Sequence, residues 1–382
     1  MNNKEVGEIR RHLRRERSNI TALYGCYVNE NKEIISRFRQ STGMMPENES
    51  DKYFALLRRT LSGALGRNLI DITFQTSQVA GSPEHQLLMD LRSTQLKDEA
   101  LLDSFYRKII ESVSMEENYL ILIGCDSYDV PFKKLDSVDH DRSEETYTYL
   151  VCAICPVKQT KANLHYVPEE KVFHDGAMNH MVSAPALGFL FPAFDNRSTN
   201  IYNALYYTRD IKLSQEALVD ALFHTPIPKP AAQQKESFEA LIMSSLGEEC
   251  SMDVMQTVHE QLCQRIEMHK EAKIPEPLMI GKEEVKEVLS SCGISQESLA
   301  KFSIDYDETF GFEADILPKN IIDEKHFQVK TPDVVIKIDP TRSDLIETRV
   351  IGGVKYILIC ADEAVEVNGV NIHIDDKSPA TV

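Results

Sequence analysis

Long apolar runs are missing from this 382-residue sequence. The most continuous runs, Tyr119–Ile123 and Tyr356–Cys360, fall far short of the roughly 18–20 residues that span a bilayer. The N-terminus stays polar through Arg17, so it lacks the apolar segment of a secretory signal. We therefore expect a cytoplasmic protein with no membrane partner, whose eight cysteines are reduced thiols.

Complete catalytic signatures are also missing. The sequence contains no GxGxxG, GxSxG or HExxH motif, and Gly281-Lys282 lacks the upstream glycine of a phosphate-binding loop. A Ser/His/Asp set can be assembled from residues that are distant in sequence, but no pattern points to one. We therefore favour a non-enzymatic protein without a cofactor and keep an enzyme as an alternative.

Positive charge is scarce and unevenly distributed. The formal net charge is −18, which argues against a protein that coats nucleic acid or membrane with its whole surface. Residues 1–75 nevertheless carry 13 Lys and Arg against 9 Asp and Glu, a net charge of +4, whereas the remainder carries −22. The sequence thus joins a basic end to an acidic body.

The composition is that of an ordinary globular protein, with 42% hydrophobic and 27% charged residues. Short apolar runs separated by turn residues predict antiparallel strands, and stretches with helical periodicity flank them. We therefore predict an α+β fold, with antiparallel sheets and flanking helices in two domains joined by a helical segment. A stiff connector is marked by Pro226, Pro228 and Pro230. The predicted parts are an N-terminal α+β domain (1–225), a proline connector with linking helices (226–274) and a C-terminal α+β domain (275–382).

A basic helix is predicted over residues 4–17. Val6, Ile9 and Leu13 form a narrow apolar stripe along it. Five arginines flank this stripe: Arg10, Arg11, Arg14, Arg15 and Arg17. Three partners fit such a helix: the phosphates of a nucleic acid, carboxylates of this chain or of a second copy in a homodimer, or another acidic protein.

A polar loop with two charged side chains follows an aromatic run over residues 189–194. Asp195 and Arg197 stand two residues apart in this loop. They could bind a ligand or a partner. Alternatively, Asp195 or Asn196 caps a helix that starts near Thr199, which is the interpretation we favour. Asp195 and Arg197 stay our ligand-binding candidates.

Two further carboxylates, Asp126 and Asp129, follow the apolar strand that begins at Tyr119. Carboxylates at the end of a strand can serve catalysis or hold a metal ion. Turn formation before Pro131 accounts for Asp129 equally well. The alternative enzyme site would therefore lie near Asp126, Asp129 and Asp195.

Cys152 and Cys155 form the only CxxC motif of the chain. In the predicted strand, residues three apart face opposite sides, so the two thiols cannot readily share a metal ion. We therefore predict two packing cysteines and no metal site.

Several runs of the sequence resemble a domain-of-unknown-function family of Gram-positive anaerobic bacteria. The resemblance covers essentially the whole chain and implies no activity. It rests on GCYVNENKEIISRF, LSGALGRNLIDI, GFLFPAFDNRSTNIYNALYYTRD, KTPDVVIKIDPTRSDLIETRVIGGVKYILI and VEVNGVNI.

The order of the predicted elements also resembles, more remotely, the bacterial nucleoid-associated protein family. Matching features are a strand-rich first half and, in the second half, a helix near 255–270, two short helices over 282–302 and terminal strands. This resemblance implies contact with DNA or a DNA-bound protein complex. We therefore predict a non-enzymatic bacterial protein of this kind, with a scaffold or dimerisation protein, or an enzyme, as alternatives.

Overall fold

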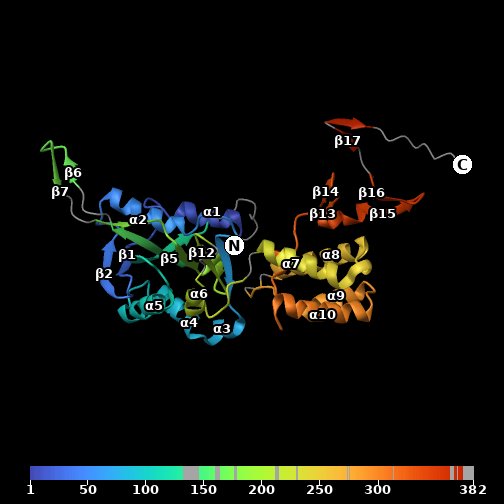
Figure 1. Cartoon of the computed structure of the whole chain (residues 1–382), viewed down its shortest axis with the longest axis horizontal. Helices are drawn as coiled ribbons and strands as arrows, with labels where there is room; N and C mark the ends of the chain where they lie inside the picture. The colour runs from blue at the N-terminus through green and yellow to red at the C-terminus, as the bar shows by residue number, and fades with distance from the viewer. Residues whose placement is uncertain are drawn as a thin grey trace, which may run out of the picture. The chain divides into compact units, whose positions relative to one another are not determined.

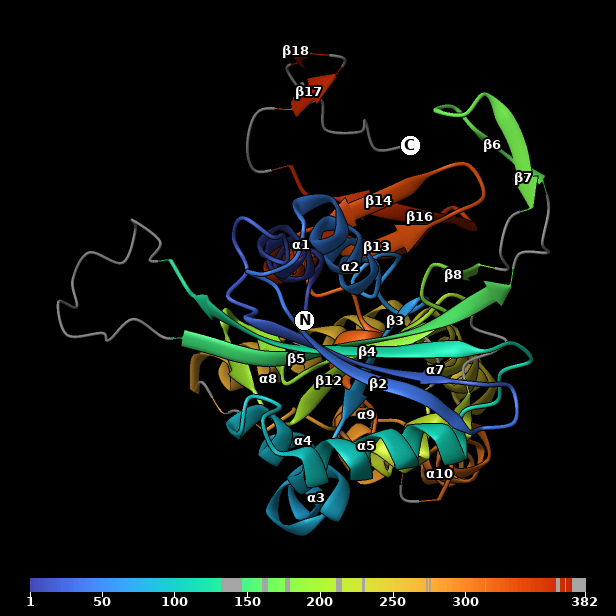
Figure 2. The ribbon, with the colours of Figure 1, turned by 90° about the vertical axis from the view of Figure 1, so that its left-hand side faces the viewer.

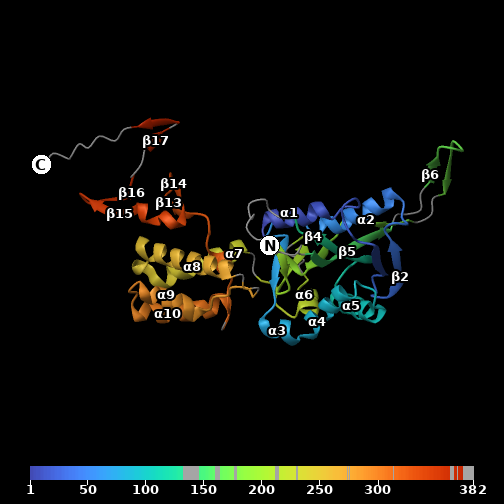
Figure 3. The ribbon, with the colours of Figure 1, turned by 180° about the vertical axis from the view of Figure 1, so that it is seen from behind.

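The structure is a computed structural model of the chain. It divides into two compact units, Met1–Pro230 with Pro275–Pro277, and Ala231–Ile274 with Leu278–Val382 (Figures 1 and 3). Helices and antiparallel sheets occur in both, which confirms the predicted α+β class. The structure describes residues 1–131, 146–159, 164–175, 179–210, 215–228, 231–272, 274, 276–312, 314–361, 365–367 and 369–372.

An eight-stranded antiparallel sheet forms the centre of the first unit. Its order is β2-β1-β4-β5-β9-β12-β3, with β8 paired to β5. The strands are β1 (Ala22–Val28), β2 (Ile34–Ser41), β3 (Leu69–Thr73), β4 (Tyr119–Asp129), β5 (Thr146–Gln159), β8 (His180–Val182), β9 (Leu187–Phe191) and β12 (Asn203–Thr208). β1 and β2 form an antiparallel hairpin, and the two predicted apolar strands pair as β4–β5.

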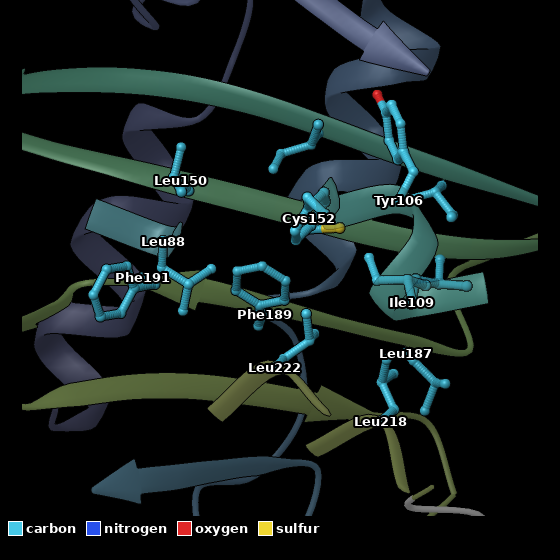
Figure 4. Packing of buried hydrophobic residues seen from close by; sticks show 14 of the residues in the cluster. Leu88, Tyr106, Ile109, Leu150, Cys152, Leu187, Phe189, Phe191, Leu218 and Leu222 are labelled. Atoms are coloured by element: carbon cyan, nitrogen blue, oxygen red, sulfur yellow. The ribbon is translucent and has the colours of Figure 1, made fainter. Parts of the chain in front are cut away.

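Helices cover both faces of this sheet (Figure 2). The first face packs against α1 (Asn3–His12) and α2 (Glu47–Arg59). The second packs against α3 (Thr76–Gly81), α4 (Pro83–Ser93), α5 (Glu99–Ser112) and α6 (Glu216–Phe223). Figure 4 shows the hydrophobic cluster on this second face, in which Phe189 of β9 lies with Leu222 of α6. Because the central strands are buried on both sides, they are almost continuously apolar.

The segment that follows the aromatic run differs from its prediction. β10 (Ala193–Asp195) and β11 (Ser198–Asn200) form a short hairpin, so no helix starts near Thr199. Asn196 and Arg197 occupy the turn with φ of 50° and 60°, the left-handed pair that a two-residue hairpin turn requires. Another hairpin is formed by β6 (Leu164–Val167) and β7 (Val172–Asp175).

Helices build the core of the second unit. They are α7 (Ala231–Leu246), the short 3₁₀ segment η2 (Gly247–Glu249), α8 (Met252–Ala272), α9 (Lys282–Ser291), α10 (Gln296–Phe310) and α11 (Pro318–Ile321). Residues 231–274, which the sequence assigns to a connector, belong to this unit. The reason is that Phe238 of α7 and Leu262 of α8 are buried in one cluster with Leu289 and Phe302.

Three two-stranded sheets follow these helices: β13 (Phe327–Lys330) with β14 (Val335–Ile338), β15 (Ile346–Ile351) with β16 (Val354–Ile359), and β17 (Val365–Val367) with β18 (Val370–Ile372). The 3₁₀ segment η3 (Pro340–Leu345) precedes β15. Within the described part of the chain, no helix is long and apolar enough to cross a membrane.

Candidate nucleic-acid interface

Helix α1 begins with a complete N-terminal cap. The Asn2 side chain accepts hydrogen bonds from the backbone of Lys4 and Glu5, and the Glu5 carboxylate accepts one from the Asn2 backbone at 2.7 Å. Val6, Ile9 and Leu13 are buried against the sheet, as the apolar stripe predicts. The sequence therefore identifies the face by which this helix docks.

The helix ends at His12, five residues earlier than predicted. Leu13 is its C-cap, and the backbone of Arg17 and Ser18 then bonds to the carbonyl of Arg14 in a turn. We call residues 14–18 the arginine turn. It directs Ser18 down to the end of strand β4, where Ser18 binds Asp126.

Asp126 anchors the arginine turn to the sheet. Its side chain is fully buried, and its oxygens accept four hydrogen bonds of 2.8–2.9 Å. The donors are the Ser18 hydroxyl, the Tyr149 hydroxyl and the backbone N–H groups of Asn19 and Ser127. Burial, together with the Asp126 charge, raises the pKa of Tyr149 well above its usual range, so the hydroxyl remains a donor. His12 Nε2 lies 3.4 Å from the same carboxylate.

A second polar anchor joins α1 to the β10–β11 hairpin. Arg197 Nη1 donates to both oxygens of Glu8 at 2.8 and 2.7 Å, and Nη2 donates to the carbonyl of Pro131. The Tyr128 hydroxyl donates to Glu8 at 2.7 Å. Burial and this hydrogen bond raise the pKa of Tyr128 to about 12, which keeps the hydroxyl protonated. Arg197, a ligand candidate from sequence, is thus half-buried and engaged in contacts within the chain.

The other predicted carboxylates are also engaged in contacts within the chain. Asp195 Oδ1 lies 3.3 Å from the ammonium group of Met1, and Oδ2 accepts a hydrogen bond from Asn200. Asp129 accepts one from the Thr146 hydroxyl at 3.0 Å. Asp126, Asp129 and Asp195 each have their own set of neighbours, and each joins different segments of the fold.

Four of the five predicted arginines are exposed. We call Arg10, Arg11, Arg14 and Arg17 the arginine patch. Among the described residues, no carboxylate lies within ion-pair distance of any of them. Arg15 differs because it is half-buried and lies 3.1 Å from Glu47 and 3.7 Å from Asp51 at the start of α2.

Some other arginines of both units pair with carboxylates, as Arg37 does with Asp103 and Arg265 with Glu284. Arg59, Arg67 and Arg107 are also exposed with no carboxylate within ion-pair distance among the described residues, so the patch differs in gathering four such arginines within residues 10–17. The helix dipole favours cations in the last turn by about 0.3–1 kcal/mol, which accounts for part of the placement of Arg10 and Arg11. That effect falls off beyond the last turn, so it does not account for Arg17.

The cysteines of the CxxC motif lie in the core. Cys152 belongs to the cluster under α4 to α6 and Cys155 to the cluster under α1 and α2, on opposite faces of β5 as predicted. Burial raises the pKa of the Cys155 thiol to about 12 and that of Cys152 well above its usual range. Both thiols are therefore protonated packing groups.

The anchors of α1 are not evident from the sequence alone. Glu8 and His12 stand four residues apart beside the apolar stripe, a spacing that places both on one helix face. That spacing is the sequence feature that could have indicated a shared polar face. Their partners Arg197 and Asp126, however, are more than 100 residues away in the sequence. Only the sheet topology brings these pairs together.

Fold and surface together define an α+β protein whose sheet carries a cation-bearing helix on one face. A family model described as a domain of unknown function (DUF4317) matches residues 1–370, and the chain belongs to this family. No curated protein and no solved structure matches it.

Proposed function

We propose that this protein binds DNA non-enzymatically through the arginine patch, in the manner of a nucleoid-associated protein. The observation that carries the proposal is the exposure of four arginines with no carboxylate partner among the described residues of a chain with net charge −18. Phosphate oxygens are the partners that such guanidinium groups would take.

The support is the contrast between the patch and its surroundings. An acidic protein offers many carboxylates, and Arg15, the neighbour of Arg14 in the chain, has three of them within 4 Å. Meanwhile, Asp126 and Glu8 fix the helix and the turn that present the patch. Rigid presentation lowers the conformational entropy that the backbone carrying these side chains loses on binding.

The test is a fluorescence-anisotropy titration of a 20-base-pair duplex at 50 mM salt. One variant replaces the whole arginine patch with alanine. A matched control replaces four exposed lysines of the second unit with alanine, giving the same change in net charge: Lys325, Lys330, Lys337 and Lys355.

The patch variant should lose at least tenfold in affinity, whereas the lysine control should stay within about twofold. Equal losses in both variants would mean that net charge alone governs binding. Wild-type protein that binds no DNA at 50 mM salt would overturn the proposal and leave an acidic protein as the partner of the patch.

A further inference from the structure

A small polar pocket of about 110 Å³ lies at one end of the large sheet. Its wall is formed by the ends of β1, β2, β4 and β5, the chain after the arginine turn and the loop after α4. Ligand pockets for drug-sized molecules usually measure 300–1,000 Å³. This pocket is therefore sized for a small group or a few water molecules.

Two cationic side chains converge on the pocket from separate elements. Arg39 of β2 donates from Nε to the Tyr24 hydroxyl at 3.2 Å, and its guanidinium lies over the Tyr24 ring, 5.8 Å from the centroid. Lys97 reaches it from the loop after α4 and donates to Gln95 at 3.0 Å. Among the described residues, neither cation has a carboxylate within ion-pair distance.

The loop that carries Lys97 is held in an uncommon conformation. Gln95 and Leu96 have φ of 52° and 63°, and Leu96 is fully buried. Consecutive left-handed residues other than glycine persist only where the surrounding structure holds them, and such places cluster at ligand sites. The buried Leu96 therefore holds the backbone at Lys97 beside the pocket.

The lining offers hydrogen-bond donors and little negative charge. Thr21, Ser127 and Thr148 supply hydroxyl groups, and the Asn19 amide group, which also lines the pocket, donates to the Ser127 carbonyl at 2.8 Å. The only carboxylate among the residues that line the pocket is Asp126, whose oxygens already accept four hydrogen bonds. Two cations with nearby donors around a small hollow make a site for an oxyanion, of which a phosphate group carries the most charge.

We propose that this pocket binds the terminal phosphate of a nucleic-acid strand. The inference rests on the proposed function, because Asn19 and Thr21 of the lining follow Arg17 of the arginine patch by two and four residues. A strand lying along the patch can therefore place its end at the pocket. A terminal phosphate monoester has more charge and fewer substituents than an internal phosphodiester, so it suits a small hollow lined by two cations better.

The experiment compares three single strands of one sequence, with a 5′-phosphate, a 3′-phosphate or neither. They are titrated into wild type, the double variant Arg39→Gln/Lys97→Gln and the control Arg37→Gln. Arg37 lies two residues from Arg39 on the same strand but pairs with Asp103, away from the pocket. Because Arg39 and Lys97 are exposed, the double variant should fold normally.

Wild type and the Arg37 control should bind one phosphorylated strand about tenfold more tightly than the unphosphorylated strand. The double variant should lose this preference and bind the unphosphorylated strand within twofold of wild type. No preference in wild type, or a preference that survives in the double variant, would overturn the inference.

Inorganic phosphate distinguishes the source of the group. One outcome is that inorganic phosphate shifts the amide signals of residues 19–21 in wild type while the strand titrations show no preference for a phosphorylated end. That combination would identify a small phosphate compound as the ligand and overturn the strand-end proposal. The unphosphorylated strand reports the arginine patch alone. If the proposed function is wrong, wild type will not bind the unphosphorylated strand. If only the pocket proposal is wrong, wild type will bind that strand but show no preference for a phosphorylated end.

Discussion

Replacing Asp126 by asparagine should strongly destabilise the first unit. The carboxylate uses each oxygen for two hydrogen bonds, and an amide has a donor where one of these oxygens was. Two donors therefore lose their acceptor whichever way the amide points. A hydrogen bond to a charged group contributes about 1.5–3 kcal/mol, so the expected loss is about 3–6 kcal/mol. Domains are typically stable by only 5–15 kcal/mol, so the loss is a large part of the total.

Two further variants calibrate this loss. Tyr149→Phe removes one donor to the same carboxylate and should cost about half as much as Asp126→Asn. Asp129→Asn alters a carboxylate at the exposed end of the same strand and should stay within about 0.5 kcal/mol of wild type. The three variants should therefore rank in that order.

Hydrogen exchange of peptides from β1 and β4 is the suitable assay, because it reports the first unit without the second. An Asp126→Asn variant that lowered the free energy of opening by less than 1 kcal/mol would refute this prediction. In that case the carboxylate would not be engaged as a structural acceptor, and a chemical role for Asp126 would regain support.

Two other predictions concern the same unit. Burial lowers the pKa of His85, so the folded protein binds its proton less readily than the unfolded chain does. The free energy of unfolding should therefore fall as the pH drops below about 6.5. Hydrogen exchange in α4 should show a smaller pH-dependent loss of stability in His85→Gln than in wild type. Gly25→Ala should displace the ring of Phe38, because an added Cβ would lie 2.0 Å from Cζ of that ring. Because these two residues pair across β1 and β2, we expect the free energy of opening to fall by about 1–3 kcal/mol, as measured by hydrogen exchange in β2. An unchanged exchange rate in β2 would contradict the close contact.

Periodicity made much of the fold predictable. The stripe of Val6, Ile9 and Leu13 identified the buried face of α1, and the apolar runs identified β4 and β5. These signals are local, because a face that is buried must repeat with the period of its helix or strand. The same reasoning placed Cys152 and Cys155 on opposite faces.

Long-range contacts account for what the sequence did not reveal. The residues after Leu13 favour a helix locally, yet α1 ends there because Ser18 and Asn19 must reach Asp126 on β4. The left-handed turn at Arg197 is likewise held by Glu8, 189 residues away in sequence. Propensity alone contains no information on such partners.

The candidate sites also differ in whether they depend on local sequence or on long-range contacts. The arginine patch could be found from sequence because its members are close along the chain. The polar pocket could not, because Arg39 and Lys97 come from separate elements that only the folded sheet brings together. The aromatic run before Asp195 was misleading as a ligand signal because Phe189, Phe191 and Phe194 fill the two cores.

The salt dependence of DNA affinity tests the central claim most directly. Each phosphate that a cation neutralises adds about 0.9 to the slope of log affinity against log salt, so four arginines contribute about 3.6. Between 50 and 200 mM salt, this corresponds to roughly a 150-fold loss of affinity in wild type that the patch variant should not show. We predict that the magnitude of this slope is smaller by about 3–4 in the patch variant than in wild type. It should be unchanged in the lysine control. Equal slopes for wild type and the patch variant would contradict the account.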